Sequence, residues 1–172
     1  MKLYRSPYEA YPFLADADDD LRCDFEILTD CMSSETGLLA ALCPERREEL
    51  LKIDELIYHA NPTLRTFMSI TEEEIAWLNA LVDALHEETK ELCNRFVLPA
   101  GTERACRAHI LRTDGKKLVR LLYRCAQRGV RVEESLLDFA NLLSGYFFML
   151  ALWLNHEDGF EEIDFVSRNY RK

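Results

Sequence analysis

The sequence predicts an all-α protein that folds as a five-helix up-and-down bundle. The chain of 172 residues contains only 6 glycines and 5 prolines, too few for the many turns of a small β fold. Apolar residues recur at spacings of three and four in five separate stretches, which is the period of an amphipathic helix. The connections between these stretches are short, as in a bundle of antiparallel neighbours. We therefore expect a single bundle domain over residues 20–172, preceded by an irregular N-terminal arm over residues 1–19.

Prolines and an acidic run delimit the first two helices. The acidic run at 16–20 suits a helix start, because the unpaired backbone amides there favour negative charge. The first helix is expected from about Leu21 to Leu42. Pro44 ends it and can open a second helix from about Glu45 to His59, and the residues Asn-Pro-Thr at 61–63 interrupt the pattern again.

A capping box opens the second half of the bundle. Thr71 and Glu74 have the spacing at which a threonine hydroxyl and a glutamate carboxylate satisfy each other's free backbone amides. The third helix is expected from there to about Phe96. The fourth and fifth helices are expected at about Thr102–Gln127 and Glu133–His156.

Two of these helices contain residues that need an explanation. Gly115, inside the fourth helix, costs on the order of 1 kcal/mol relative to alanine, which predicts a kink or the close approach of another backbone. From Leu136 to Leu154 the fifth helix is apolar enough to nearly span a bilayer. One of its faces is nevertheless interrupted by polar or small residues: Asp138, Asn141, Ser144 and Gly145. These interruptions predict the central helix of a bundle, or a helix buried against partner chains, and no membrane insertion.

Charge and cysteine content restrict the classes of function. The formal net charge of −10 argues against general nucleic-acid binding, which needs a broad positive surface, but a local basic pocket can still hold a nucleotide. The cysteines are scattered, with no zinc-site spacing, so we predict no metal site. All six are interpreted as structural thiols inside helices: Cys23, Cys31, Cys43, Cys93, Cys106 and Cys125. Reduced thiols, together with a start that lacks the apolar core of a signal peptide, predict a cytoplasmic protein.

A row of cations stands out in this acidic chain. Arg112, Lys116 and Arg120 are four residues apart and therefore share one face of the fourth helix. Three interpretations fit the pattern. The cations face carboxylates of neighbouring helices, they bind an anion such as a polyphosphate, or they form a solvated face with ion pairs inside the chain.

Four motifs in the same order and on the same helices resemble the PduO-type ATP:cob(I)alamin adenosyltransferase family. The first is TDCMSSETG at 29–37, and the second is FVLPAG at 96–101. The third is AHILRTDGKKLVR at 108–120. The last is ANLLSG at 140–145, followed by LNHEDG at 154–159.

The resemblance implies a homotrimer of five-helix bundles, with ATP and Mg²⁺ bound between adjacent subunits and the corrinoid close beside them. It implies transfer of the 5′-deoxyadenosyl group of ATP to cob(I)alamin, which gives adenosylcobalamin (coenzyme B12) and releases triphosphate. The partners are then small molecules, with no nucleic acid and no membrane. The protein must align the nucleotide over the cobalt and must make the lower axial ligand of the cobalt leave.

The catalytic residues implied by the resemblance are Arg112, Asp30 and Phe96. Phe96 matches the aromatic wedge that the family places below the corrin ring. Arg112 matches an arginine that contacts the triphosphate and pairs across the subunit interface with an aspartate, here Asp30.

The cofactor-binding residues lie on the last two helices. Asn141 matches an asparagine near the nucleotide. Lys116 and Lys117 replace a pair of arginines, keeping the charge without the planar fork of a guanidinium. Arg120, at the end of the basic row, completes this set.

Departures from the family pattern leave other functions open. Val119 stands where the family has a glutamate near the ribose, Cys31 replaces another glutamate, and the N-terminal phosphate loop of the family has no counterpart here. A non-catalytic corrinoid-binding or delivery protein, or a structural trimer without ligands, would fit the same scaffold. His109 and His156 match family positions and are interpreted as hydrogen-bonded structural histidines.

Overall fold

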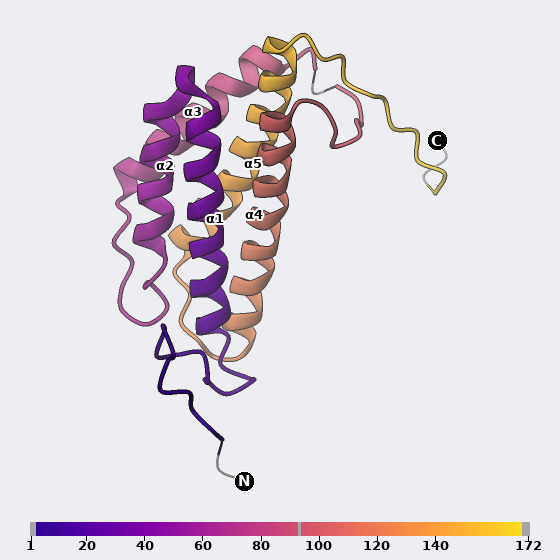
Figure 1. The fold of residues 1–172 in the computed structure, drawn as a ribbon. Coiled ribbons are helices and arrows are strands. Elements are labelled where there is room, and N and C mark those ends of the chain that lie inside the picture. The colour runs from indigo at the N-terminus through magenta and orange to yellow at the C-terminus, as the bar shows by residue number, and fades with distance from the viewer. Residues whose placement is uncertain (1–2, 93, 170–172) are drawn as a thin grey trace.

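The computed structural model describes residues 3–92 and 94–169, and within them it is an all-α fold of five helices (Figure 1). The elements, in order, are α1 (Arg22–Leu42), the 3₁₀ turn η1 (Pro44–Arg46), α2 (Arg47–Ala60), α3 (Glu72–Thr89), α4 (Glu103–Gln127) and α5 (Glu134–Glu157). The predicted fold class is thereby confirmed. So are the boundaries of four of the five helices, within about two residues.

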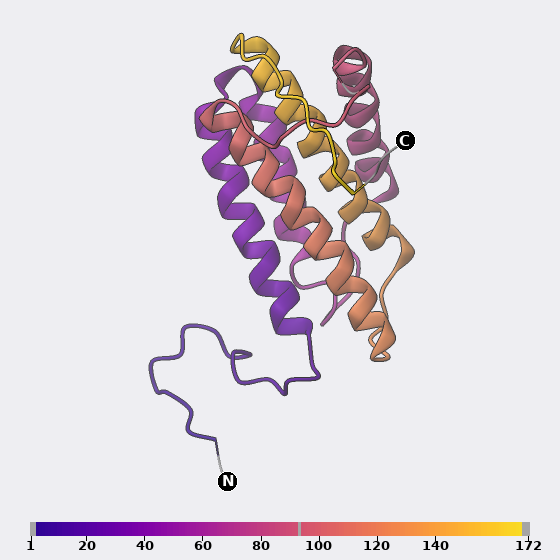
Figure 2. The same cartoon turned by 90° about the vertical axis from the view of Figure 1, so that its right-hand side faces the viewer.

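Successive helices along the chain alternate in direction, and they form a bundle in the spatial order α2–α1–α4–α5–α3, in which α5 and α3 run parallel (Figures 1 and 2). Each helix packs mainly on its neighbours in that order. The centre of the core is α5, whose largest inward side chains are completely buried: Phe139, Tyr146, Phe147 and Leu150. Among the described helices, α5 alone is long and apolar enough to cross a membrane, and half of that stretch is buried inside the bundle. Burial of this apolar surface is the main stabilising contribution to the fold.

The predicted capping box at the start of α3 is present. The Thr71 hydroxyl accepts a hydrogen bond from the Glu74 amide at 3.2 Å, and the Glu74 carboxylate accepts one from the Thr71 amide at 2.8 Å. The predicted end of α3 at Phe96 is wrong, because the helix stops at Thr89. Beyond it, the backbone of Phe96 is hydrogen-bonded to the C-terminal tail, since the Phe165 amide donates to the Phe96 carbonyl at 2.8 Å. That pairing is incompatible with a continued helix.

The N-terminal arm is held at the end of the bundle opposite to the loop that connects α3 and α4 (Figure 1). Residues 3–20 contain turns and no regular helix. Arg65 bonds the arm to the bundle, with Asp16 at 2.6 Å on one side and the buried Glu26 of α1 at 2.5 Å on the other. The same guanidinium lies 3.7 Å from the centre of the Phe13 ring.

The cysteines are largely structural, with two corrections. The five described ones are free thiols: Cys23, Cys31, Cys43, Cys106 and Cys125. Cys31 is exposed on α1 and Cys43 lies just beyond the end of that helix, so neither fits the expectation of a thiol buried inside a helix. Burial raises the pKa of Cys43 and of Cys125, which keeps both as neutral thiols. Cys93 lies outside the described residues.

Candidate functional site

The loop that precedes α4 closes a cavity of about 360 Å³ against α4 and α5. Three of the predicted site residues, Phe96, Arg112 and Lys116, line it together. The whole lining comes from three separate segments: Arg95, Phe96, Val97, Arg112, Lys116, Ser144, Gly145 and Phe148. The predicted wedge Phe96 and two cations of the predicted row therefore share one cavity. A mixed apolar and cationic lining suits a ligand with an anionic group and a flat apolar surface.

One side of this cavity depends on a close approach between α4 and α5. A Cβ atom on Gly115 would lie 3.0 Å from both Cα and Cβ of Ser144. One turn earlier, the Ser144 hydroxyl donates to the Arg112 carbonyl at 3.0 Å. Since α4 runs without interruption through Gly115, the glycine permits close packing of two helices and produces no break in the helix.

Arg112 presents an unneutralised charge to the cavity. Its side chain is half-buried, and its Nε atom is buried without a hydrogen-bond partner among the described residues. The guanidinium lies 5.6 Å from the centre of the Phe148 ring, within the range of a cation–π contact. Burial lowers the pKa of Arg112, but a guanidinium remains protonated in proteins. Hence this positive charge is partly desolvated and available to an anion.

The rest of the basic row is also unpaired within the chain. Lys116 and Arg120 are exposed and form no ion pair with a described carboxylate. The ion pairs that α4 does make involve Arg104, Arg107 and Lys117. The interpretation in which the row faces carboxylates of the same chain is therefore wrong for the described residues.

The structure separates Lys117 and Arg120 from the cavity. Lys117 pairs with Asp114 at 2.7 Å on the exposed side of α4, and neither Lys117 nor Arg120 lines the cavity around Phe96. Their predicted contacts with a nucleotide stay predictions.

Asn141 lies in an adjoining groove. This groove, about 610 Å³ in volume, runs between α3 and α5 and shares Gly145 with the first cavity. The Asn141 side chain donates to the Leu137 carbonyl at 2.8 Å, so it already bonds to its own helix. Its amide oxygen remains free to accept a hydrogen bond.

Asp30 does not join this cavity within one chain. It is exposed on α1, forms no ion pair with the described residues, and lies on the helix that packs on the other side of α4 from α5. Contact between Asp30 and Arg112 of a neighbouring subunit stays a prediction.

His109 differs from the expectation of a hydrogen-bonded histidine. It is 4% exposed, and neither ring nitrogen has a partner among the described residues. Burial, assisted by the charge of Arg112, lowers the pKa of His109 to about 4. The imidazole is therefore neutral and lies beneath Phe148, with 6.5 Å between the ring centres.

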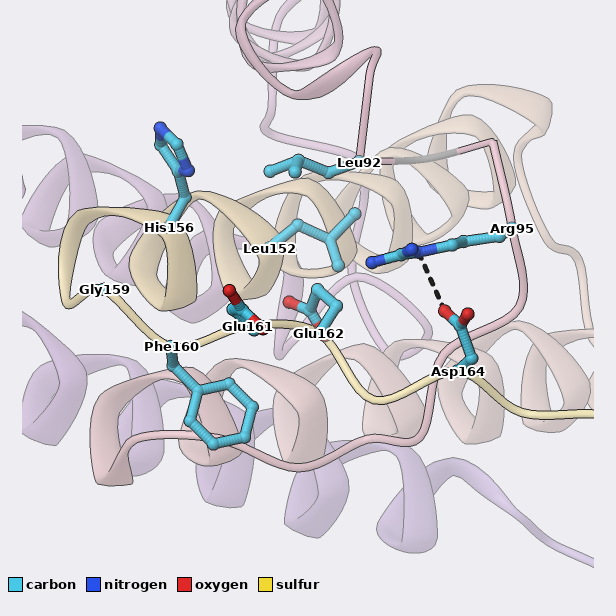
Figure 3. Close-up of a pocket in the computed structure, with 9 residues that line it drawn as sticks. All are labelled: Leu92, Arg95, Leu152, His156, Gly159, Phe160, Glu161, Glu162 and Asp164. Atoms are coloured by element: carbon cyan, nitrogen blue, oxygen red, sulfur yellow. Dashed lines mark ion pairs between the residues drawn. The ribbon is translucent and has the colours of Figure 1, made fainter.

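A second cavity, of about 660 Å³, lies at the C-terminal end of α5 (Figure 3). It includes the exposed His156 and the ion pair between Arg95 and Asp164, whose atoms are 2.9 Å apart. Arg95 lines both cavities, so the Phe96 loop forms the wall between them. No local sequence pattern indicates Arg95, because its partner Asp164 belongs to an irregular tail.

Comparisons with known proteins agree on one family. The sequence model of the family described as cobalamin adenosyltransferase matches residues 17–154. The corrinoid adenosyltransferase of Bacillus subtilis (strain 168) is 30% identical over 122 residues. The match covers 68% of this chain and 62% of that relative, so it spans less than two thirds of the relative's length.

Solved structures support the same fold. A variant PduO-type ATP:corrinoid adenosyltransferase from Lactobacillus reuteri, in complex with cobalamin and ATP, superposes with a TM-score of 0.73 at 21% identity, covering 86% of this chain and 87% of that one. Another variant from the same organism, in complex with ATP, superposes with a TM-score of 0.72 at 25% identity, covering 87% and 88%.

Proposed function

The chain belongs to the cobalamin adenosyltransferase family, and we propose that it transfers the 5′-deoxyadenosyl group of ATP to cob(I)alamin. The electron pair of Co(I) forms a bond to the 5′ carbon of ATP. The bond from that carbon to the triphosphate oxygen breaks, and triphosphate leaves with the electron pair. The relative solved in complex with cobalamin and ATP supports this pair of substrates.

The observation that supports the proposal is that two side chains line the same cavity: an arginine without an ion-pair partner among the described residues, and an exposed aromatic residue. Arg112 is partly desolvated and has no anionic partner in the part of the chain that the structure describes, and Lys116 adds a second positive charge one turn later. Phe96 stands at the same cavity with 83% of its surface exposed. A triphosphate matches the two cations, and a planar corrin ring matches the aromatic.

These residues have separate roles in the proposed reaction. Arg112 and Lys116 bind the triphosphate and stabilise the negative charge that develops on it as the bond to carbon breaks. Phe96 occupies the space below the corrin ring and excludes the lower axial ligand. The asparagine oxygen of Asn141, in the adjoining groove, accepts a hydrogen bond from the nucleotide.

A homotrimer would complete the site. Asp30 and Arg112 lie on different faces of the bundle, and neither has an ion-pair partner among the described residues, which supports a contact between Arg112 of one subunit and Asp30 of the next. In such an assembly, ATP bound beside Arg112 would lie at a subunit boundary.

Mg²⁺ would be held mainly by the substrate. The described residues contain no group of three or more histidine, cysteine, aspartate or glutamate side chains placed for a metal ion. Magnesium commonly keeps several waters and binds through substrate phosphates, and the cavity leaves a triphosphate accessible to it. When bound, the ion would offset phosphate charge beside Arg112 and Lys116.

A corrinoid-binding protein without catalysis is the second candidate. Val119 is apolar and packs against the core, so it accepts no hydrogen bond from a ribose. The N-terminal arm is held by Arg65 at the opposite end of the bundle from the loop that connects α3 and α4, so within one chain its described residues supply no phosphate loop to the cavity. The contacts that remain at the Phe96 cavity would still bind a corrinoid.

One assay separates these functions. Purified protein is mixed with chemically reduced cobalamin and MgATP without oxygen, and the products are followed by absorbance before and after illumination. A photolabile cobalt–carbon product that requires ATP supports the transferase. Cobalamin binding without product, and without any effect of ATP on its affinity, supports the binding protein. Binding of neither ligand would contradict both.

A further inference from the structure

The side chain of Asn155, in the last turn of α5, holds the loop that carries Phe96. Asn155 is 0% exposed. Its amide nitrogen donates to the Ala100 carbonyl and to the Glu162 carboxylate, both at 2.9 Å. Its amide oxygen accepts from the Thr102 backbone amide at 3.1 Å. One buried side chain therefore bonds the loop, the start of α4 and the C-terminal tail.

The loop is shaped to meet this amide. Gly101 has a φ of +136°, a backbone conformation that favours glycine. A Cβ atom at this position would lie 1.9 Å from the Asn155 amide oxygen. Only glycine lets the loop backbone come this close to the Asn155 side chain.

The C-terminal tail holds the same loop from its other side. The Leu98 amide donates to the Ile163 carbonyl at 2.8 Å, and the Phe165 amide donates to the Phe96 carbonyl at 2.8 Å. The Arg95–Asp164 ion pair lies beside these bonds, where the loop and the tail run close together (Figure 3). Glu162, the tail residue bonded to Asn155, immediately precedes this pairing.

These contacts fix the backbone of a residue whose side chain is exposed. Phe96 is 83% exposed, so packing against the core does not determine its position. Aromatic groups that act by excluding a ligand must be held within a fraction of an ångström, because small displacements are costly for a positioned reaction. The hydrogen bonds around Asn155 supply the restraint that core packing does not.

We propose that Asn155 is a positioning residue that, through Ala100 and the Glu162-bearing tail, holds Phe96 at its working position below the corrinoid. The role assigned to Phe96 rests on the proposed function, whereas the restraint on the loop does not. Asn155 touches neither substrate in this arrangement and acts only through Phe96.

Hydrogen exchange tests the restraint on the ligand-free protein. In Asn155→Ala, backbone amides of residues 94–102 and 160–166 should exchange roughly tenfold faster than in the wild type, about the loss of one net hydrogen bond. Asn61→Ala is the matched control, because Asn61 is also an asparagine that donates to a backbone carbonyl, that of Glu26 at 2.7 Å, but at the far end of the bundle. It should leave exchange in both segments unchanged. Unchanged exchange in Asn155→Ala would overturn the restraint.

A second variant tests the same restraint in case Asn155→Ala does not fold. Glu162→Ala removes the Asn155 bond to the tail and leaves Asn155 itself in place, and Glu162 is half-buried in the tail, outside the core of the bundle. It should speed exchange in residues 160–166 more than in 94–102. If the amides of both segments exchange as slowly in Glu162→Ala as in the wild type, Asn155 does not hold the tail.

A double-mutant comparison tests the positioning role. The readout is the fraction of Co(II)alamin in the four-coordinate state with MgATP, measured spectroscopically beside the dissociation constant of MgATP. Asn155→Ala should lower that fraction several-fold while MgATP affinity stays within about twofold. Asn155→Ala combined with Phe96→Ala should be no worse than Phe96→Ala alone. Additive losses would show that Asn155 does not act through Phe96 and would overturn the proposal.

Failure of the proposed function gives a different result. In that case the wild type itself forms no four-coordinate Co(II)alamin and no cobalt–carbon product. The exchange experiment then still decides whether Asn155 restrains the loop, while the positioning role in catalysis is overturned.

Discussion

At the scale of single residues, one turn of α4 carries both a partly buried cation and a buried neutral histidine. Arg112 brings a partly desolvated cation to the cavity, and the neutral His109 lies one turn earlier beneath Phe148. Removing the Arg112 side chain deletes a charge. Removing the His109 side chain deletes two buried nitrogens that have no hydrogen-bond partner among the described residues.

Arg112→Ala should weaken ATP binding by about 1.5–3 kcal/mol, which is roughly a 10- to 100-fold loss of affinity. The reason is the loss of a charge-assisted contact to phosphate in a partly water-free site. Calorimetric titration with MgATP measures the change, and Lys116→Ala should give a smaller loss because Lys116 is exposed. The control is Arg131→Ala, whose exposed pair with Glu133 lies away from the cavity. Unaltered affinity in Arg112→Ala would count against the nucleotide site.

His109 should make the fold sensitive to mild acid. Its pKa is about 4 when folded against 6.5 as the ordinary value, so the unfolded chain binds more protons between these values. Stability from this group is fully present above about pH 6.5 and is progressively lost as pH falls towards 4, by on the order of 3 kcal/mol in total. His109→Leu should remove that slope and, because it deletes two unsatisfied buried nitrogens, should stabilise the protein. Urea unfolding at pH 7 and pH 4.5 measures both. If the unfolding free energy changes equally between the two pH values in the wild type and in His109→Leu, His109 is not the source of the pH dependence.

At the scale of elements, the contact between α4 and α5 sets the geometry of the cavity. Gly115 permits it, whereas Gly145, on the facing helix, has only Val82 near an added Cβ, at 3.8 Å. The two glycines therefore offer a matched pair of substitutions to alanine.

Gly115→Ala should destabilise the protein and Gly145→Ala should stabilise it. Alanine gains up to about 1 kcal/mol over glycine in either helix. At Gly115 the new methyl group would meet the Ser144 backbone at 3.0 Å, and overpacking of this kind costs about 1–3 kcal/mol. Thermal unfolding of the two variants measures the difference. Equal gains at both positions would mean that α4 and α5 can separate at little cost.

The helices also show which features of the fold can be predicted from residues that are close together in the sequence. Helical periodicity placed α1, α2, α4 and α5, and the capping box placed the start of α3, since these signals lie within a few residues. The end of α3 was mispredicted because the Phe96 backbone pairs with Phe165, 69 positions later (165 − 96). A spacing of four placed Arg112 and Lys116 on one face, but only the fold shows that neither has a carboxylate partner in the described chain. The pairing of Lys117 with Asp114, three residues earlier, is local and offsets the charge of Lys117.

At the scale of the whole molecule, the unpaired charges on two sides of the bundle predict assembly. Asp30 is exposed on α1 and Arg112 lines the cavity of α4 and α5, and a ring of three copies would bring them together. In the proposed trimer, the complete site would therefore depend on more than one chain.

Asp30→Ala and Arg112→Ala should weaken the trimer to similar extents, and the double variant should be little worse than either. Two groups of one ion pair lose the same interaction, so their effects are not additive. Light scattering over a dilution series measures the assembly. A wild-type protein that stays monomeric at micromolar concentration would remove both the trimer and the inter-subunit site.

The placement of the two described chain ends has a practical consequence for anyone handling the protein. The N-terminal arm is bonded by Arg65 at the far end of the bundle, whereas the C-terminal tail is paired with the loop of Phe96. An affinity tag or a fluorescent reporter joined to the N-terminus would sit away from the cavity. The same addition at the C-terminus would pull on the tail that holds Phe96. Within one chain, immobilisation through the N-terminal arm therefore leaves the Phe96 loop and its tail unstrained.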